Sequence, residues 1–515
     1  MSFLHPWPAL EQAAAQWPHE DALVFPHQQA GRSFAQYRTE ALALAGARSA
    51  RGITAGDHVA LLAENRVEWA IVQMACAAAG FVFVPLNTHY RKDDLAYALK
   101  QSDSKALVCS TQYRSNPYLE NVTALRPTLP LLAHVFTLEE DYPRLIAEGH
   151  DFKPVTPDPS AVAALLYTSG TTGFPKGALL AHRAMMMVAA SSATRLGVSA
   201  SDRWTSIIPL FHCAGCILNL LGCLSHGAAY VGVPSFDPEN MFRIIEGQRC
   251  THLSGVPTSY LAMLDHPSRK GYDLTSLKAG SCGGADCNPD VLKRCADAFP
   301  IPGLSQVYGQ TEGGTLFACP EHDDPLRWET AGRALPDYEL RIVHPETLER
   351  LAPGEIGEIQ ARGPMVMEGY YNKPEATAET IIDGSWLRTG DLGYLRDDGR
   401  VVIAGGRLRD MIIRGGENIY PAEIENVLQE HEAISEVAVF GVPDDYYGEI
   451  VGAAVKLSRP ILASELQALC AQRIAKFKVP AVIYAVERFP LTPSGKIRKV
   501  ELRELARENR MEKLS

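Results

Sequence analysis

The sequence predicts an α/β protein with a large N-terminal domain of mixed, mostly parallel sheets flanked by helices, followed by a small mobile α+β domain. The chain of 515 residues is too long for one compact core, because domains typically hold about 100–200 residues. Strand and helix patterns alternate over the first four hundred residues, which favours a parallel sheet covered by helices. Near residue 405 this alternation gives way to a shorter α+β pattern.

The clearest strand–helix–strand pattern lies in residues 58–87. Val59–Leu62 is an apolar run typical of a buried strand, Asn65–Ala79 has helical spacing, and Phe81–Val84 is a second apolar run that ends at Pro85. Two further buried strands are predicted in KALVCS (105–110) and AVAALLY (161–167).

The change of pattern near residue 405 predicts a domain boundary. Glycines at 405, 406, 415 and 416 flank a charged turn, Arg407 to Asp410. We predict a large domain over 1–405, a hinge over 406–410 and a small domain over 411–515. Local composition alone is equally compatible with a surface loop. The small domain is expected to contain helices at 423–431 and 463–475, the second with Ser464 as its N-cap, and strands at 434–442, 450–457 and 481–489.

Charge and composition narrow the function classes. The net charge of −11 argues against nucleic acid as a partner, because there is no basic excess to neutralise phosphates. The N-terminus lacks a signal-peptide pattern, and the most apolar stretch, Ala70–Val84, is shorter than the roughly 20 residues of a membrane span. We therefore expect a soluble, cytoplasmic protein. The eleven cysteines are scattered, as reduced buried thiols are, and the pair Cys213 and Cys216 has no second pair at zinc-ribbon spacing.

A loop rich in glycine and hydroxyl side chains follows the strand at 161–167. The segment YTSGTTGFPKG, Tyr167–Gly177, lets successive backbone N–H groups converge on an anion, and Lys176 adds a mobile positive charge. It is not a Walker P-loop, because Pro175 precedes Lys176 and Gly177 follows it. The segment predicts polyphosphate binding.

The same segment resembles the phosphate-binding signature of the adenylate-forming superfamily, which includes acyl-CoA synthetases, luciferase-like enzymes and adenylation domains of peptide synthetases. Five more segments match in the family's order: PLFHCAG (209–215), VYGQTEGG (307–314), RTGDLG (388–393), GRLRDMIIRGGENIYPAEIE (406–425) and PLTPSGKIRK (490–499). The resemblance implies that a carboxylate attacks the α-phosphate of ATP to give an acyl-adenylate and pyrophosphate. A thiol, coenzyme A, then displaces AMP.

The resemblance also implies roles for residues that would bind ATP and Mg²⁺. Glu312 would bind Mg²⁺, and Thr311 would contact the α-phosphate. Asp391, assisted by Arg407, would accept hydrogen bonds from the ribose. The β- and γ-phosphates would lie against Thr168, Ser169, Gly170, Thr171, Thr172, Gly173 and Lys176. The adenine would lie against Gly283, Gly284, Ala285, Tyr308 and Gly309.

Other implied roles concern the small domain. Lys496 would stabilise negative charge on the α-phosphate during adenylation. Arg409 matches the pivot of the rotation that then removes this lysine, although the family usually has Asp or Lys there. A hinge needs backbone freedom rather than a particular charge, so the departure does not affect the prediction. Gly415, Gly416 and Tyr447 would line the path of coenzyme A.

The residues expected around the acid are small and uncharged. His212 matches a position near the substrate carboxylate, and the rest of the set is Cys213, Gly283, Gly309, Gly313, Gly314 and Thr315. None could pair with an α-ammonium or a second carboxylate, which favours an apolar monocarboxylic acid. The segments at 209–228 and 250–264 look most like medium-chain fatty acyl-CoA synthetases, and aryl acids are the nearest alternative.

Two other interpretations stay open. The chain could load a separate carrier protein instead of coenzyme A, or bind nucleotide without catalysis. Retention of Lys176, Glu312, Asp391 and Lys496 together argues against the second. The expected partners are therefore a small carboxylic acid and coenzyme A, and the sequence leaves a homodimer open.

Overall fold

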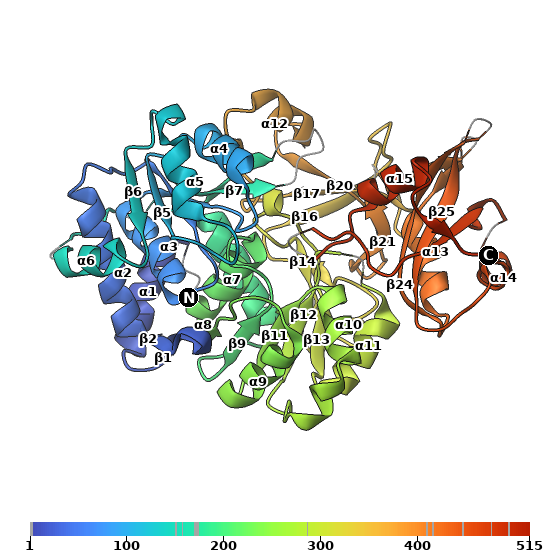
Figure 1. Cartoon of the computed structure of the whole chain (residues 1–515), viewed down its shortest axis with the longest axis horizontal. Helices are drawn as coiled ribbons and strands as arrows, with labels where there is room; N and C mark the ends of the chain where they lie inside the picture. The colour runs from blue at the N-terminus through green and yellow to red at the C-terminus, as the bar shows by residue number, and fades with distance from the viewer. Residues whose placement is uncertain are drawn as a thin grey trace. The chain divides into compact units, whose positions relative to one another are not determined.

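The computed structural model describes residues 4–149, 152–156, 158–168, 175–285, 287–407, 410–414, 417–444, 447–474, 476–492 and 495–515 (Figure 1). Two compact units are present. Unit 1 comprises Met1–Gly283, Pro289–Glu339 and Ala361–Leu387, and unit 2 comprises Gly284–Asn288, Leu340–Gln360 and Arg388–Ser515. The predicted domain limits, 1–405 and 411–515 with a hinge between them, stay a prediction.

The first sheet of unit 1 is built around β3 and runs in the order β18-β8-β7-β4-β3-β5-β6. β3 pairs in parallel with β4 and β5, and only β8 and β18 run antiparallel to their neighbours. Its strands are β3 (His58–Leu62), β4 (Val82–Pro85), β5 (Ala106–Cys109), β6 (His134–Thr137), β7 (Val162–Thr168), β8 (Lys176–Ala181) and β18 (Gly369–Tyr370). The strands predicted at 59–62, 81–84, 105–110 and 161–167 are all present.

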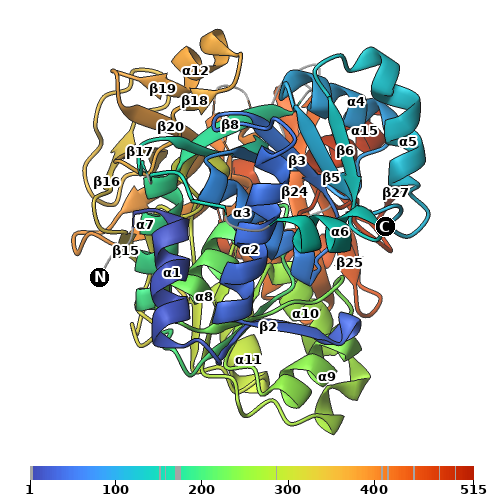
Figure 2. The same cartoon turned by 90° about the vertical axis from the view of Figure 1, so that its left-hand side faces the viewer.

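Helices cover both faces of this sheet (Figure 2). Leu95 and Leu99 of α4 (Lys92–Gln101) and Tyr118 and Val122 of α5 (Tyr118–Leu125) pack in one buried cluster with inward residues of β3, β4 and β5. The predicted helix at 65–79 is α3 (Val67–Ala79), which begins two residues late because Arg66 is extended and occupies the N-cap position. It ends at Gly80, whose φ of 70° is the left-handed conformation common after helices.

A second sheet of unit 1 runs in the order β13-β12-β11-β9-β10-β1-β2, with every pair parallel except β1 and β2. Its strands are β1 (Asp21–Phe25), β2 (Ala30–Ser33), β9 (Arg203–Ser206), β10 (Ala229–Val231), β11 (His252–Gly255), β12 (Ala279–Cys282) and β13 (Gly303–Gln306). The mostly parallel, mixed sheets predicted for the large domain are confirmed.

The remaining helices of unit 1 are α1 (Pro6–Gln16), α2 (Phe34–Ser49), α6 (Asp141–Glu148), α7 (His182–Arg195), α8 (Gly222–His226), α9 (Pro238–Gln248), α10 (Pro257–Asp265), α11 (Pro289–Ala298) and α12 (Pro374–Thr380). A π-helix, η3 (Ala214–Leu221), precedes α8. Such helices are rare and often lie at functional sites.

Unit 2 ends in a sheet of order β23-β22-β25-β26-β27, with β24 also paired to β25. Alternate residues of β24 enter two separate cores: Val439 packs with α13 and α14, whereas Phe440 packs with α15. The elements are β22 (Ile412–Arg414), β23 (Glu417–Ile419), α13 (Pro421–Gln429), β24 (Ile434–Asp444), β25 (Gly448–Leu457), α14 (Ala463–Arg473), β26 (Val482–Ala485), α15 (Lys499–Arg507) and β27 (Glu512–Lys513). This is the predicted α+β pattern.

One local prediction in unit 2 is wrong. Ser464 is not the N-cap of α14, because the helix already begins at Ala463 and the capping position is Leu462, which makes no side-chain cap. The N–H of Ala463 instead donates to the carbonyl of Ser515. A tertiary contact, which local sequence cannot reveal, therefore sets the start of this helix.

The remaining strands of the described residues are β14 (Ala318–Cys319), β15 (Arg333–Ala334), β16 (Glu339–Val343), β17 (Gly357–Arg362), β19 (Ile381–Ile382), β20 (Trp386–Leu395) and β21 (Val401–Arg407). None of the helices in the described part of the chain combines the length and the apolar character that a membrane crossing requires. All eleven cysteines are buried free thiols, as predicted.

Candidate active site

The ends of the predicted phosphate loop lie side by side in unit 1. Thr168 ends β7, Lys176 begins β8, and the two residues are antiparallel partners in the register. The loop is thus the connection of a β-hairpin, and its two ends are fixed by a sheet. Of the predicted phosphate-binding residues, Ser169, Gly170, Thr171, Thr172 and Gly173 lie outside the described residues.

The Glu312 carboxylate lies next to this hairpin. Its Oε1 accepts hydrogen bonds from the Thr168 hydroxyl (3.1 Å) and from the Tyr370 hydroxyl (2.8 Å). Lys176 completes the group, because its Nζ lies 5.0 Å from the centre of the Tyr370 ring. Sequence positions 168, 176, 312 and 370 therefore meet at one place, which puts a cation and a carboxylate beside the predicted phosphate loop.

Sequence reasoning did not identify Tyr370. It belongs to β18, a two-residue strand that pairs with β8 at the edge of the first sheet. Its distance from Glu312 in the sequence and the shortness of its strand leave no local signal for this contact.

Glu312 fits the requirements of a magnesium ligand. Mg²⁺ is usually held by one or two carboxylates together with substrate phosphates, rather than by a dedicated cage of side chains. Within the described ranges there is no group of three or more His, Cys, Asp or Glu side chains arranged to hold a metal. Binding of Mg²⁺ by Glu312 stays a prediction.

Thr311, His212 and Cys213 form a second group in unit 1. The Thr311 hydroxyl donates to Cys213 Sγ (3.3 Å), and His212 Nδ1 lies 3.7 Å from the same sulfur. Burial opposes ionisation of Cys213, but the electrostatic interaction and hydrogen bond with His212, together with the hydrogen bonds with Thr311 and Thr315, outweigh it and lower the pKa of this thiol. Thr311, predicted near the α-phosphate, and His212, predicted near the acid, thus both contact Cys213.

The π-helix η3 begins directly after Cys213. Asn219 of this helix is fully buried. Its side-chain amide nitrogen donates to Ser254 Oγ at 2.8 Å, and Trp204 Nε1 donates to the same oxygen at 2.9 Å. With the side-chain oxygen and nitrogen of Asn219 exchanged, the nitrogen donates to the Ala214 carbonyl and to Ser206 Oγ, both at 2.9 Å. A buried amide needs such partners, so these contacts tie the helix to the second sheet. Asn219 is another residue that the sequence did not single out.

At Gly309 and Gly313, two of the glycines predicted to line the acid site, any larger residue would clash with neighbouring atoms. A Cβ on Gly309 would lie 2.1 Å from the Thr315 carbonyl oxygen, and one on Gly313 would lie 2.0 Å from the Phe317 ring. Gly314 has a φ of 67°, and Thr315 has a φ of 121°, which is rare for a β-branched residue and typical of strained functional segments. The segment after Glu312 is therefore a tightly constrained turn.

The predicted adenine contacts fall in both units. Tyr308 is buried in unit 1, where its ring lies 5.4 Å from that of Phe317. Gly283 also lies in unit 1, with Val307 at 2.7 Å from where its Cβ would be. Gly284 and Ala285 belong to unit 2. Their contact with a base stays a prediction.

Asp391 lies in β20 of unit 2, where the pairing with β21 is irregular. The Thr389 hydroxyl donates to the Ile359 carbonyl (2.6 Å) and accepts from the Asp391 N–H (3.1 Å), and Gly390 has a φ of 69°. In the register of β20 and β21, Asp391 is the partner of Arg407. The two residues predicted to bind ribose are therefore neighbours along the backbone ladder, although the Arg407 side chain lies outside the described atoms.

Lys496 belongs to a small hairpin of unit 2. The Lys496 N–H donates to the Thr492 hydroxyl (3.0 Å), the Thr492 N–H donates to the Lys496 carbonyl (2.7 Å), and Gly495 has a φ of 83°. These bonds hold the backbone on which the lysine is presented.

The remaining predicted residues of unit 2 concern coenzyme A and the pivot. Tyr447 is 41% exposed, and the Arg414 guanidinium lies 4.4 Å from its ring centre. Arg409, Gly415 and Gly416 lie outside the described residues, so the pivot and most of the coenzyme A path stay predictions.

Comparison with known proteins gives two family matches. Residues 10–371 match the AMP-binding enzyme family, and residues 423–496 match the AMP-binding enzyme C-terminal domain. Together these matches span most of the chain, including the segments that contain Thr168, Glu312 and Lys496.

Three individual proteins illustrate the similarity. The chain is 39% identical to the "Putative acyl-CoA synthetase YngI" of Bacillus subtilis, with 96% of each chain covered. It is 32% identical to the mitochondrial medium-chain acyl-CoA ligase ACSF2 of Mus musculus, covering 96% of this chain and 86% of that one. The structure of the anthranilate CoA ligase AuaEII in complex with anthranoyl-AMP superposes with a TM-score of 0.91 at 25% identity, covering 99% of this chain and 98% of that one.

Proposed function

The chain belongs to the AMP-binding enzyme family, and we propose that it joins an apolar monocarboxylic acid, preferably a medium-chain fatty acid, to coenzyme A. The broader assignment follows from the family: the chain is an enzyme of the acyl-CoA synthetase type and uses ATP, Mg²⁺ and coenzyme A with a small carboxylic acid. The reaction gives an acyl-adenylate and pyrophosphate, and then acyl-CoA and AMP.

The contacts of Glu312 carry this proposal. The carboxylate is held by Thr168 and Tyr370 next to Lys176, at the mouth of the predicted phosphate loop. When bound, Mg²⁺ would offset the negative charge of the phosphates. Glu312 would hold it, and Lys176 would bind phosphate oxygens.

The second group would orient the attack on ATP. Thr311 is next to Glu312 in the chain and bonds Cys213, which follows His212. A carboxylate bound beside His212 would therefore lie close to a phosphorus held by Thr311. Such positioning of two reactants accounts for a large part of catalysis in reactions of this kind.

The choice of acid rests on the chemistry of the same residues. His212, Cys213 and Thr315 offer an imidazole, a thiol and a hydroxyl, and none is an arginine for a second carboxylate or a carboxylate for an ammonium. A relative named as a medium-chain acyl-CoA ligase supports the fatty acid, whereas a neighbouring anthranilate CoA ligase supports an aryl acid as the alternative. A separate carrier protein in place of coenzyme A is a further alternative.

We also propose the roles of unit 2, where Lys496 would act in adenylation, Asp391 with Arg407 would bind ribose, and Arg409 would be the pivot. A homodimer and a cytoplasmic location are also proposals. The mouse relative is named as mitochondrial, which is the alternative location. Light scattering on the purified protein gives the oligomeric state directly.

A panel of acids tests the proposed substrate. Release of AMP is measured with Mg·ATP and coenzyme A for octanoate, benzoate, malonate and phenylalanine. The proposal predicts the highest kcat/KM for octanoate, with benzoate second. A preference for malonate or phenylalanine would contradict the assignment of His212, Cys213 and Thr315 to an apolar acid site.

A further inference from the structure

A buried hydrogen bond joins the turn before His212 to the first sheet. Asn65, which is 6% exposed, follows the end of β3, and its Oδ1 accepts from the backbone N–H of Leu210 at 2.8 Å. Leu210 is fully buried and lies two residues before His212. A buried N–H needs an acceptor, and the amide of Asn65 supplies one from a residue 145 positions away in the chain.

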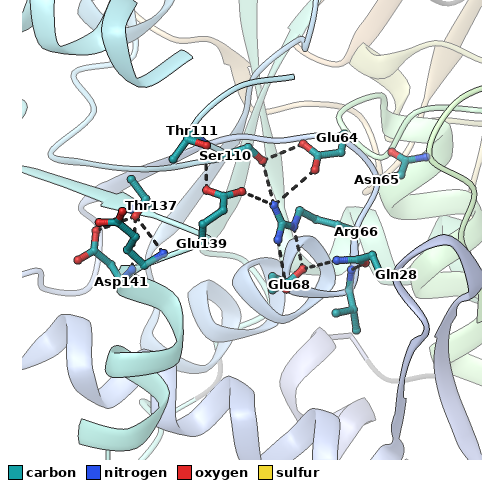
Figure 3. Close-up of polar contacts among 12 residues, drawn as sticks. Gln28, Glu64, Asn65, Arg66, Glu68, Ser110, Thr111, Thr137, Glu139 and Asp141 are labelled. Carbon is teal, nitrogen blue, oxygen red and sulfur yellow. Dashed lines mark hydrogen bonds and ion pairs between the residues drawn. The ribbon is translucent and has the colours of Figure 1, made fainter. Parts of the chain in front are cut away.

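A cluster of charges surrounds Arg66, the residue next to Asn65 in the chain (Figure 3). Arg66 Nε lies 2.8 Å from Glu68, and its Nη1 lies 2.7 Å from Glu139 and 3.4 Å from Glu64. Burial works against the charge of this guanidinium, but the bonds to Glu68 and the other carboxylates outweigh it and raise the pKa of Arg66. Glu64 and Glu68 lie two residues to either side of Arg66 in the chain, whereas Glu139 follows β6. Arg66 therefore joins the segment between β3 and α3 to the end of β6.

Two further bonds hold the same turn. His27 Nε2 lies 3.1 Å from the carbonyl oxygen of Asn65, and the N–H of Val67 donates to Gln28 Oε1 at 2.8 Å. These two bonds anchor the backbone at Asn65 and at Val67 to the segment that contains His27 and Gln28. The backbone that carries the Asn65 side chain cannot shift without breaking ion pairs or partly buried hydrogen bonds.

The position of Asn65 in the sheet is informative. The chain leaves β3 for β4 on one side and returns to β5 on the other, so Asn65 and Arg66 lie at the carboxyl edge where the strand order reverses. Residues at such switch points commonly form or support ligand sites in open α/β sheets. In this chain Arg66 is paired with carboxylates, so the cluster provides rigidity rather than a free charge.

The turn that Asn65 holds has little freedom of its own. The His212 N–H donates to the Pro209 carbonyl (3.0 Å), and a Cβ on Gly215 would lie 2.2 Å from the same oxygen. Asn65 holds this turn from the first sheet, whereas the contacts of Asn219 hold η3 from the second. His212 and Cys213 lie between these two anchors.

We propose that Asn65 is a positioning residue for the acid: through Leu210 it fixes the turn that carries His212 and Cys213, without touching the substrate itself. The identity of the bound acid rests on the proposed function, but the mechanical coupling from Asn65 to Cys213 does not. The test therefore has one readout in catalysis and one that needs no activity.

The catalytic readout compares two substitutions of Asn65. Asn65→Asp keeps an oxygen that accepts from Leu210, whereas Asn65→Leu is similar in size and leaves that N–H without an acceptor. We expect Asn65→Leu to raise KM for the acid about tenfold, the loss that an unsatisfied buried donor produces, with KM for ATP unchanged. Asn65→Asp should restore most of the wild-type KM. Ser104→Ala, which removes a buried hydroxyl pair before β5, is the control and should leave both KM values unchanged.

The second readout is the alkylation of Cys213 by iodoacetamide, mapped by peptide mass spectrometry. Cys213 is 4% exposed, so its labelling should be slow in the wild type and rise about tenfold in Asn65→Leu. Cys250, which is fully buried elsewhere in unit 1, reports general unfolding and should stay unlabelled.

Three results would overturn the proposal: unchanged Cys213 labelling in Asn65→Leu, an Asn65→Asp variant as impaired as Asn65→Leu, or equal increases at Cys213 and Cys250. If the wild type adenylates no acid at all, the proposed function fails. The labelling of Cys213 then still decides whether Asn65 holds the turn.

Discussion

Replacing Glu312 by Gln should abolish most adenylation while leaving the fold intact. The Glu312 Oε1 accepts hydrogen bonds from Thr168 at 3.1 Å and from Tyr370 at 2.8 Å. A glutamine keeps an oxygen that accepts both, but it loses the negative charge. Because hydrogen bonds to charged groups exceed neutral ones by about 1 kcal/mol, the free energy of unfolding should fall by no more than about 2 kcal/mol.

The effect on the reaction should be much larger. Removing one electrostatic contributor from an active site typically reduces the rate by about 10²–10³-fold, or about 3–4 kcal/mol. We therefore expect acid-dependent exchange of labelled pyrophosphate into ATP to fall at least about a hundredfold. The remaining activity should require a higher Mg²⁺ concentration.

A matched variant separates charge from hydrogen bonding. Tyr370→Phe removes one hydrogen bond to Glu312 and keeps its charge, so the rate should fall by about tenfold or less. A Glu312→Gln enzyme with normal exchange and normal Mg²⁺ dependence would refute the metal role. Equal losses in the two variants would mean that the hydrogen bond, not the charge, is what matters.

Further predictions concern the small domain and acid stability. Lys496→Ala should cripple formation of the acyl-adenylate but largely spare thioester formation from supplied acyl-adenylate, and equal defects in both steps would show that the lysine is structural. Arg409→Pro, which fixes φ near −65°, should do the reverse, and normal overall turnover would place the pivot elsewhere. Burial lowers the pKa of His5 to about 4 and, with His5 stacked 3.8 Å away, that of His182 to about 3, against an ordinary 6.5. The unfolded chain therefore binds more protons below pH 6.5, and each of the two histidines should lower the free energy of unfolding by on the order of 3 kcal/mol between pH 6.5 and 4. Urea unfolding of His182→Phe should depend less on pH, and an equally steep dependence would contradict this cause.

The regular elements of the fold could be predicted because burial alone sets their patterns. The apolar run at 59–62 is buried on both sides of a parallel sheet, and helical spacing identifies α3 to within two residues. The predicted start of α3 is two residues early because Asn65 and Arg66 are held by distant partners rather than by the helix. Ser464 fails as a cap for the same reason, since a contact to the C-terminal residue sets the start of α14.

The candidate site divides in a similar way. Lys176, Glu312 and Thr311 belong to compact motifs: the residue types of the loop indicate Lys176, and the resemblance of YGQTE to a family motif indicates Thr311 and Glu312. Tyr370 and Asn219 could not be found, because each acts through a contact that only the sheet topology creates. Residues that bind a ligand tend to lie in short motifs, whereas residues that hold those motifs in place are scattered along the chain.

Acid-dependent pyrophosphate exchange in the absence of coenzyme A tests the central claim most directly. The purified protein is incubated with ATP, Mg²⁺, labelled pyrophosphate and octanoate, and label in ATP is measured. The account predicts that label enters ATP only when the acid is present, and that coenzyme A then converts the intermediate to acyl-CoA with release of AMP. Formation of ADP as the only nucleotide product across the acid panel, with no exchange, would contradict it.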